Sequence, residues 1–283
     1  MKTIKRLSRY CPLLPFLIIV GIYEVVPLAF IVVRGFYSPG TTMLSVENYQ
    51  AVLSKKVYLT CIRNSMYVSL LSAFAGLAIS FLTALSLTKV SPKIQSVGLS
   101  LLNITSNFGG VALAFAFIII LGSAGVLVNV GRILNIGFLA DFDLYSRDGL
   151  IFMYIYFQIP LGTLLLLPAF EAIKVEWKES AALMKASSAT FWLRVGIPVL
   201  APSLLSTFSI LFANALTAFN CVYALVSNSF LLLPIKIQSM FVGDVKLQPE
   251  LGSALSTIML LILVAVMGAC NLVKWMLDRR MAK

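Results

Sequence analysis

The sequence has no histidine and few charged residues. Lys, Arg, Asp and Glu make up 12% of its 283 residues, about half of the roughly 25% that is usual in soluble domains. Without histidine the chain lacks the commonest metal ligand and general base. Its four cysteines, none in a Cys-x-x-Cys pair, predict no disulfide framework; they are Cys11, Cys61, Cys221 and Cys270. We therefore predict no catalytic and no metal-binding residue.

What the sequence has instead is apolar residues, which make up 60% of it. A soluble protein of this composition would expose large apolar patches to water. A helix needs about 20 apolar residues to cross a bilayer core of about 30 Å, and a continuous helix is the expected form of a span in lipid. Six runs meet this length, so the expected fold class is an all-α integral membrane protein. The runs are 12–33, 65–87, 97–121, 149–170, 199–225 and 251–275.

The basic residues predict the orientation of these spans. The first run is longer than a signal-peptide core and no small-residue cleavage site follows it, so we expect an uncleaved anchor. With both termini in the cytoplasm, 14 of the 22 Lys and Arg residues lie inside, as the positive-inside rule requires. The net charge of +11 is thus mostly explained by the basic residues that set the membrane topology, and it gives no reason to expect a nucleic-acid partner.

Three segments are expected on the outer side, at 34–64, 122–148 and 226–250. The second carries Asp141, Asp143 and Asp148, either as a solvated loop or as a docking surface. The third contains an apolar run at 231–234, which is too short to span and is expected to be re-entrant, interfacial or the top of the fifth helix.

The inner segment 171–198 differs from the other loops. It is long, rich in Ala, and mixes Lys and Glu at helical spacings, which favours a helix at the membrane surface. The pattern alone is compatible with two roles, a linker helix lying on the lipid headgroups or a docking helix for a cytoplasmic partner.

The residues of this segment resemble the EAA loop of ABC importer permeases. The family pattern is Glu-Ala-Ala, three residues, Gly, nine residues, Ile, one residue and Leu-Pro. The match keeps this spacing over 20 residues, with Lys185 where the family has Gly. The matching positions are Glu179, Ser180, Ala181, Lys185, Ala186, Ser187, Val195, Ile197 and Pro198.

This resemblance implies a type I, binding-protein-dependent permease with a single domain over 1–283. Its loop would couple to a separate ATP-binding subunit dimer, which would hold ATP and Mg. A second permease chain and an extracytoplasmic solute-binding protein are the other implied partners, in the cytoplasmic membrane of a bacterium or archaeon. The chain itself would be no enzyme and carry no cofactor. The alternative is a secondary transporter or channel that works without ATP.

Lys185 departs from the family pattern. Glycine permits a left-handed turn between two short helices, whereas a residue with a Cβ there costs roughly 1–2 kcal/mol. Either the turn is built differently in this chain, or the strain is accepted because Lys185 meets an acidic group on the partner.

Polar residues inside the spans are candidates for the solute pathway. The four candidates are Glu24, Asn107, Asn214 and Asn220. Each could instead make an interhelical hydrogen bond, and the stretch 107–110 is expected to break its helix. The single deep carboxylate, together with a weak resemblance of 232–235, 243–244 and 252–255 to permeases for polyamines, phosphonates, iron, thiamine or sulfate, slightly favours a polyamine-like solute.

Overall fold

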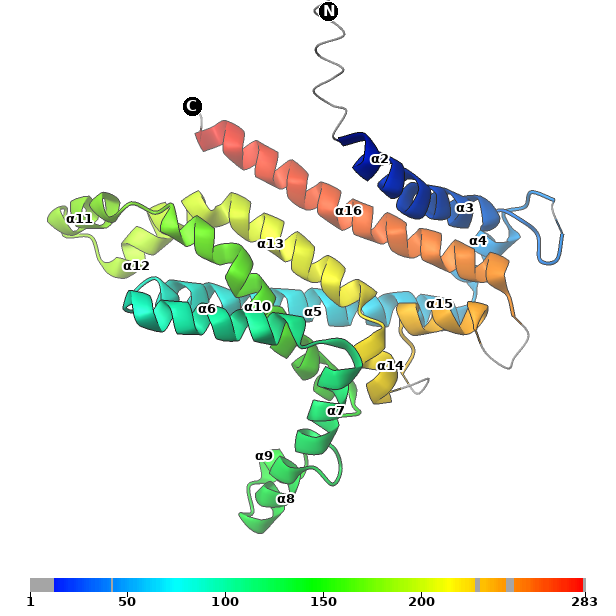
Figure 1. Cartoon of the computed structure of the whole chain (residues 1–283), viewed down its shortest axis with the longest axis horizontal. Helices are drawn as coiled ribbons and strands as arrows, with labels where there is room; N and C mark the ends of the chain where they lie inside the picture. Colours follow the sequence, from blue (N-terminus) through cyan, green and yellow to red (C-terminus); the bar gives the residue numbers. More distant parts are fainter. Residues whose placement is uncertain (1–12, 42, 227–229, 243–246, 282–283) are drawn as a thin grey trace, which may run out of the picture. The chain divides into compact units, whose positions relative to one another are not determined.

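The computed structural model describes residues 13–41, 43–226, 230–242 and 247–281, with side chains to residue 279. The described chain is almost entirely helical, and its only β feature is one isolated bridge between Tyr37 and Leu44. The helices shown in Figure 1 are α2 (Leu14–Val20), α3 (Val26–Arg34), α4 (Glu47–Ser54), α5 (Lys56–Leu87), α6 (Pro92–Asn107), α7 (Gly110–Leu121), α8 (Val126–Ile133), α9 (Gly137–Ala140), α10 (Arg147–Glu171), α11 (Val175–Leu183), α12 (Ser188–Phe191), α13 (Ile197–Thr217), α14 (Asn220–Val226), α15 (Leu233–Phe241) and α16 (Pro249–Met281), with π-helical turns η2 (Gly21–Val25) and η3 (Trp192–Gly196).

Six helical segments in the described chain are long and apolar enough to cross a membrane, which confirms the expected number. They are Leu14–Arg34, Lys56–Leu87, Gly110–Ile133, Arg147–Glu171, Ser188–Thr217 and Pro249–Arg279. A turn separates α7 from α8 inside the third segment. The second segment begins nine residues before the expected position, and the fifth begins eleven before it.

Two of the expected spans are broken. The third, expected at 97–121, is interrupted at Phe108 and Gly109, where Gly109 is extended and Gly110 has a φ of +65°. The fifth, expected at 199–225, is interrupted at Ala218 and Phe219, because Ala218 leaves the helical region with a ψ of 97°. The first break is the one expected at 107–110; the second was not expected.

The chain divides into two compact units. Unit 1 comprises Met1–Cys61 and Lys236–Ile262, and unit 2 comprises Ile62–Ile235 and Leu263–Lys283. In unit 1, the buried amide of Asn48 donates to the carbonyl oxygens of Gly35 (3.1 Å) and Tyr37 (2.7 Å). Arg34 and Glu250 form an ion pair at 3.5 Å. These contacts join the end of α3 to the starts of α4 and α16.

Unit 2 is built around α10, the most buried of the membrane-length helices. A Cβ at Gly76 of α5 would lie 2.7 Å from the Cβ of Gln158, and one at Gly162 would strike Ser80. These glycines therefore let the backbones of α5 and α10 approach closely. Gln158 is fully buried, and its Nε2 donates to the carbonyl oxygen of Leu211 at 2.8 Å, which ties α10 to α13.

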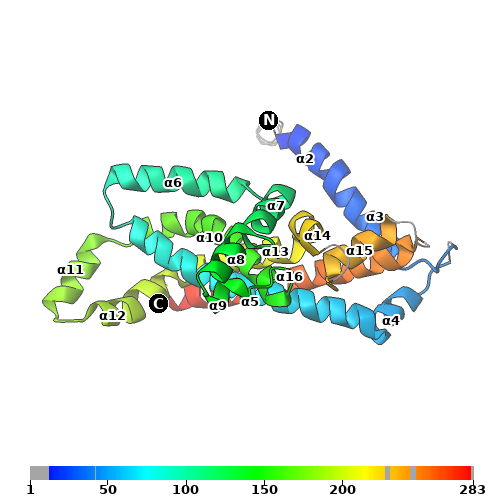
Figure 2. The same ribbon diagram turned by 90° about the horizontal axis from the view of Figure 1, so that it is seen from below.

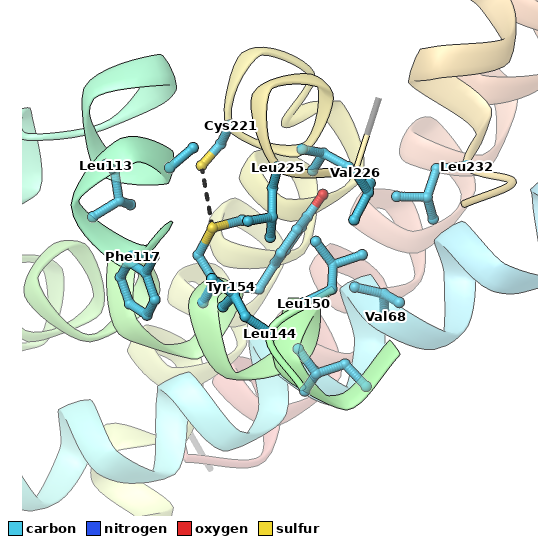
Figure 3. Packing of buried hydrophobic residues seen from close by; sticks show 14 of the residues in the cluster. Val68, Leu113, Phe117, Leu144, Leu150, Tyr154, Cys221, Leu225, Val226 and Leu232 are labelled. Atoms are coloured by element: carbon cyan, nitrogen blue, oxygen red, sulfur yellow. Dashed lines mark hydrogen bonds between the residues drawn. The ribbon is translucent and has the colours of Figure 1, made fainter. Parts of the chain in front are cut away.

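A buried apolar cluster joins α7, α10 and α14 (Figure 3). Cys221 lies in it as a packing residue, with its sulfur 3.9 Å from that of Met153. The run at 231–234 is no extension of the fifth helix, because Leu233 begins the separate helix α15. Leu232 and Leu233 are buried, and the N–H of Leu233 donates to the hydroxyl of Ser65 at 2.7 Å.

Candidate functional site

The segment 171–198 forms two short helices joined by a turn. α10 ends at Glu171, α11 covers Val175–Leu183, and α12 covers Ser188–Phe191 before the chain continues through η3 into α13. Both views place α11 and α12 beyond the ends of α10 and α13 (Figures 1 and 2). The expected helix–turn–helix is therefore present, and we call 171–198 the coupling loop below.

The turn of the coupling loop is left-handed at Lys185, whose φ is +57°. The N–H of Ala186 donates to the carbonyl oxygen of Ala181 at 3.0 Å, and the N–H of Lys185 donates to that of Ala182 at 2.9 Å. This pair of bonds is the Schellman motif, which usually has glycine at the left-handed position. The sequence left two explanations for Lys185. The structure agrees with the second, in which the turn is left-handed and the backbone strain at Lys185 is accepted.

Ser187 starts the second short helix. Its hydroxyl accepts from the N–H of Thr190 at 3.1 Å, which satisfies one of the unpaired donors at the start of α12. Ala181 is buried and Ala186 is partly buried in one apolar cluster with Phe170 and Phe191. The small residues of the motif therefore seat the turn against the ends of α5 and α10.

The outer surface of the coupling loop combines charged and apolar side chains. Glu179, Ser180 and Lys185 are exposed. Leu183 and Met184 are 86% and 76% exposed, although apolar side chains of this size are usually covered. Together these residues present an apolar tip with flanking charges beyond the membrane-length helices.

Trp192 fixes the second half of the loop to the helices. Its ring lies 5.9 Å from those of Phe81 in α5 and Phe170 in α10, measured between centroids. Gly196 makes this possible, because a Cβ there would strike the Trp192 ring. Pro198 lies in the first turn of α13, which tolerates its missing N–H.

A pocket of about 300 Å³ lies where the two helix breaks meet. The Cβ of Asn220 lies 3.8 Å from where a Cβ on Gly110 would be. The freed carbonyl oxygen of Ala218 accepts from the hydroxyl of Tyr154 at 3.3 Å. The polar lining comes from Ser106, Asn214, Thr217 and Asn220, and the aromatic lining from Phe157 and Phe219.

The four pathway candidates fall in different places. Asn214 and Asn220 line this pocket together. Asn107 is not among its lining residues, and its amide donates to the carbonyl oxygen of Asn103 in its own helix at 2.8 Å. Glu24 belongs to unit 1 and lies exposed in η2.

Several residues of the two sites were not anticipated. Leu183 and Met184 lie inside the matched motif, but only their exposure in the structure distinguishes them. Ser106 and Thr217 flank the helix breaks, and the break at Ala218 carries no Gly or Pro that would signal it. Within the described ranges, no group of three or more Cys, Asp or Glu residues is placed to hold a metal ion.

No protein-family model matches the chain. The sulfoquinovosyl glycerol transport system permease protein SmoH of Agrobacterium fabrum is 28% identical over 195 residues, which cover 69% of this chain and 62% of SmoH. The thiamine transport system permease protein ThiP of Haemophilus influenzae is 27% identical over 127 residues, which cover 45% of this chain and 23% of ThiP. The chain thus spans less than two thirds of the length of either relative.

Solved structures match all or most of the chain. A bacterial ABC transporter involved in the import of the acidic polysaccharide alginate contains a chain with a TM-score of 0.76 and 18% identity, covering 100% of this chain and 99% of that one. The MetNI methionine ABC transporter in an inward-facing conformation matches with a TM-score of 0.56 and 13% identity over 79% of this chain and 99% of that one. This chain is therefore related in sequence to the permeases of ABC importers, and it has the fold of a type I importer permease.

Proposed function

We propose that this chain is the permease subunit of an ABC importer. We further propose that the coupling loop links transport to ATP hydrolysis by a separate ATPase. The observation that carries this proposal is the exposed tip formed by Leu183 and Met184. The tip is held by the Schellman turn at Lys185 and by the buried Ala181. An apolar tip flanked by Glu179 and Lys185 is suited to a groove in a cytoplasmic protein, where burial of the apolar side chains would stabilise the contact.

The proposed partners follow from this role. An ATP-binding subunit dimer would hold ATP and Mg, since the sequence has no Walker A phosphate-binding motif. A second permease chain would complete the pathway. An extracytoplasmic binding protein would deliver the solute; one solved alginate transporter of the same fold is described in complex with a pentasaccharide-bound periplasmic protein. The excess of Lys and Arg in the inner segments supports cytoplasmic termini in a bacterial or archaeal cytoplasmic membrane.

We further propose that the pocket between the helix breaks belongs to the solute pathway. Its described lining offers the amides of Asn214 and Asn220, the hydroxyls of Ser106 and Thr217, and no charged side chain. Neutral donors and acceptors beside aromatic rings suit an uncharged polar solute, such as a glycoside. A polyamine would need a carboxylate, and Glu24, on which that expectation rested in part, is not among the lining residues.

The coupling role is tested by isolating the tagged chain from its native membranes and measuring the ATP hydrolysis that co-purifies. We expect Leu183→Asp and Met184→Asp to lose this activity while the chain stays in the membrane. Met43→Asp is the matched control, because Met43 is 75% exposed and lies in the segment expected on the outer side. ATP-independent uptake by the isolated chain, driven by an ion gradient, would overturn the proposal in favour of a secondary transporter.

The solute class is tested by uptake of labelled spermidine and of a labelled neutral disaccharide into cells with and without this chain. We expect the uptake of both probes to be independent of the carboxylate of Glu24, and therefore to be unchanged in Glu24→Gln. Uptake of spermidine that depends on the chain and is lost in Glu24→Gln would contradict a neutral pathway.

A further inference from the structure

The short helices α8 and α9 form a hairpin at the far end of α7, within unit 2 (Figure 1). Gly131 lets the two helices meet closely, because a Cβ there would lie 2.6 Å from the Cβ of Leu139. The left-handed Asn135 joins them, and the N–H of Ile136 donates to the carbonyl oxygen of Gly131 at 2.8 Å. The α8–α9 hairpin is therefore a packed unit with a closed turn.

The side of α8 that faces away from α9 is apolar and exposed. Val128 and Gly131 are buried on the inner side of the helix. Val126, Val130 and Ile133 are spaced by four and three residues and so share the opposite side, where Ile133 is 78% exposed. The turn and α9 add three more exposed apolar side chains, those of Leu134, Ile136 and Phe138. An exposed apolar surface of this kind marks an interaction site.

Exposed apolar side chains continue from α7 into the hairpin. Phe115 and Ile119 of α7 are exposed, and α7 belongs to a segment apolar and long enough to cross a membrane. The eight residues of α8 cover only about 12 Å at 1.5 Å per residue, less than half of a bilayer core of about 30 Å. The hairpin is thus apolar enough for lipid but too short to cross it, which is typical of a segment in the membrane interface.

The helix α10 places the hairpin near one surface of the bilayer. α9 ends at Ala140 and α10, which is of membrane length, begins at Arg147, so a short connection joins them. The other end of α10, at Glu171, leads into the coupling loop. The hairpin therefore lies near the bilayer surface opposite the coupling loop. Asp141 and Asp143 in the connection are exposed, and their charges keep it in water.

The charge on the hairpin also suits a lipid surface. Arg132 is exposed on the polar side of α8, where its Nη1 donates to the Oδ1 of Asn129 at 3.4 Å. Neither of the two ion pairs found among the described residues involves Arg132. A guanidinium binds phosphate oxygens well, and its long stem can pass along apolar surface. Arg132 is therefore available to a headgroup phosphate while the neighbouring apolar side chains enter the acyl region.

We propose that the α8–α9 hairpin docks into the lipid leaflet opposite the coupling loop, with Ile133 and Phe138 among the acyl chains and Arg132 at a headgroup phosphate. Docked in this way, the hairpin holds the far end of α7, whose first residue, Gly110, lines the pocket at the helix breaks. A soluble binding protein fits this surface less well, because its dissociation would leave the apolar side chains in water. The inference requires only that the chain spans a membrane, so it goes beyond the proposed function and does not depend on it.

The docking is tested with a fluorescent amino acid at Ile133 or at Asp141 of the full chain, reconstituted with any co-purifying subunits in vesicles of phosphatidylethanolamine and phosphatidylglycerol. One quencher is a phospholipid with a nitroxide near the headgroup end of its acyl chain, and the other is aqueous iodide. We expect the nitroxide to quench Ile133 at least about threefold more than Asp141, and iodide to show the reverse order. Equal iodide quenching at the two positions would mean that water covers the face, and weak quenching of Ile133 by both agents would mean that protein covers it. Either result would overturn the proposal.

A charge substitution tests the same face through a second probe position. With the fluorescent residue at Phe138, we expect Ile133→Asp to lower quenching by the lipid nitroxide at least about twofold, because a carboxylate is costly among acyl chains. The substitution leaves the packing of the hairpin intact, since the Ile133 side chain is exposed. Asn129→Asp is the matched control, because it adds the same charge on the polar side of α8, and it should leave the quenching unchanged. A similar loss in both variants, or in neither, would contradict docking through this face.

Discussion

The N–H of Ala186 donates to the carbonyl oxygen of Ala181 across the left-handed Lys185, and this bond closes the coupling loop. The described residues contain one other non-glycine residue with positive φ, Asn135, which ends α8 with the same bond pattern. Asparagine tolerates this conformation, whereas lysine gains nothing from it. The strain at Lys185 therefore points to a use for its side chain outside the turn.

Lys185→Gly should stabilise the turn by roughly 1–2 kcal/mol, since the Cβ is the source of the strain. The same substitution should lower coupled uptake if the lysine meets an acidic group on the ATPase, as we expect. Thermal inactivation of the purified complex and ATP-driven uptake measure the two effects separately. Unchanged or faster uptake with normal assembly would rule out a required lysine contact.

Gly196→Ala should displace the Trp192 ring, because the new methyl group would occupy its position. Overpacking of this kind costs about 1–3 kcal/mol, and we expect a lower inactivation temperature together with a changed tryptophan emission. Gly268→Ala is the control, because a Cβ there meets nothing within 4 Å and lies inside α16. Alanine favours a helix over glycine by about 1 kcal/mol, so this variant should be unchanged or slightly more stable.

The spans could be predicted because their length and composition suffice. The packing of the spans could not be predicted, because a lipid-facing helix surface is as apolar as a buried one. The 3.6-residue periodicity of apolar residues therefore does not show which face of a span is buried. The close approach of α5 and α10 depends on Gly76 and Gly162, which read in sequence as ordinary small residues.

The candidate sites show the same limit. The left-handed turn at Lys185 followed only from the resemblance, since no local glycine signals it. The break at Ala218 is set by tertiary contacts, among them the hydrogen bond from Tyr154 and the burial of Val222 and Leu225. Asn214 and Asn220 were candidates one by one, but only the folded chain brings them into one pocket. Their role in transport stays a prediction.

Asn220→Leu should slow uptake by removing a hydrogen-bonding group from the pocket. A lost hydrogen bond to the solute is worth about 1 kcal/mol, or roughly fivefold in affinity. Asn107→Leu is the matched control, because among the described residues the amide of Asn107 donates to the carbonyl oxygen of Asn103 in its own helix. Initial rates of ATP-driven uptake below saturation compare the two variants, and equal rates would remove the pocket from the pathway.

Gln158 offers a stability test that is independent of transport. Its Nε2 donates to Leu211, but its buried Oε1 has no hydrogen-bond partner among the described residues. Gln158→Met loses one hydrogen bond and also removes the unsatisfied oxygen, so we expect a change of less than about 1 kcal/mol. Gln158→Glu would instead bury a carboxylate beside the carbonyl oxygen of Leu211, at a cost of roughly 3–5 kcal/mol. Thermal inactivation of the two variants in the same detergent should differ widely, and similar values would mean that water reaches this position between α10 and α13.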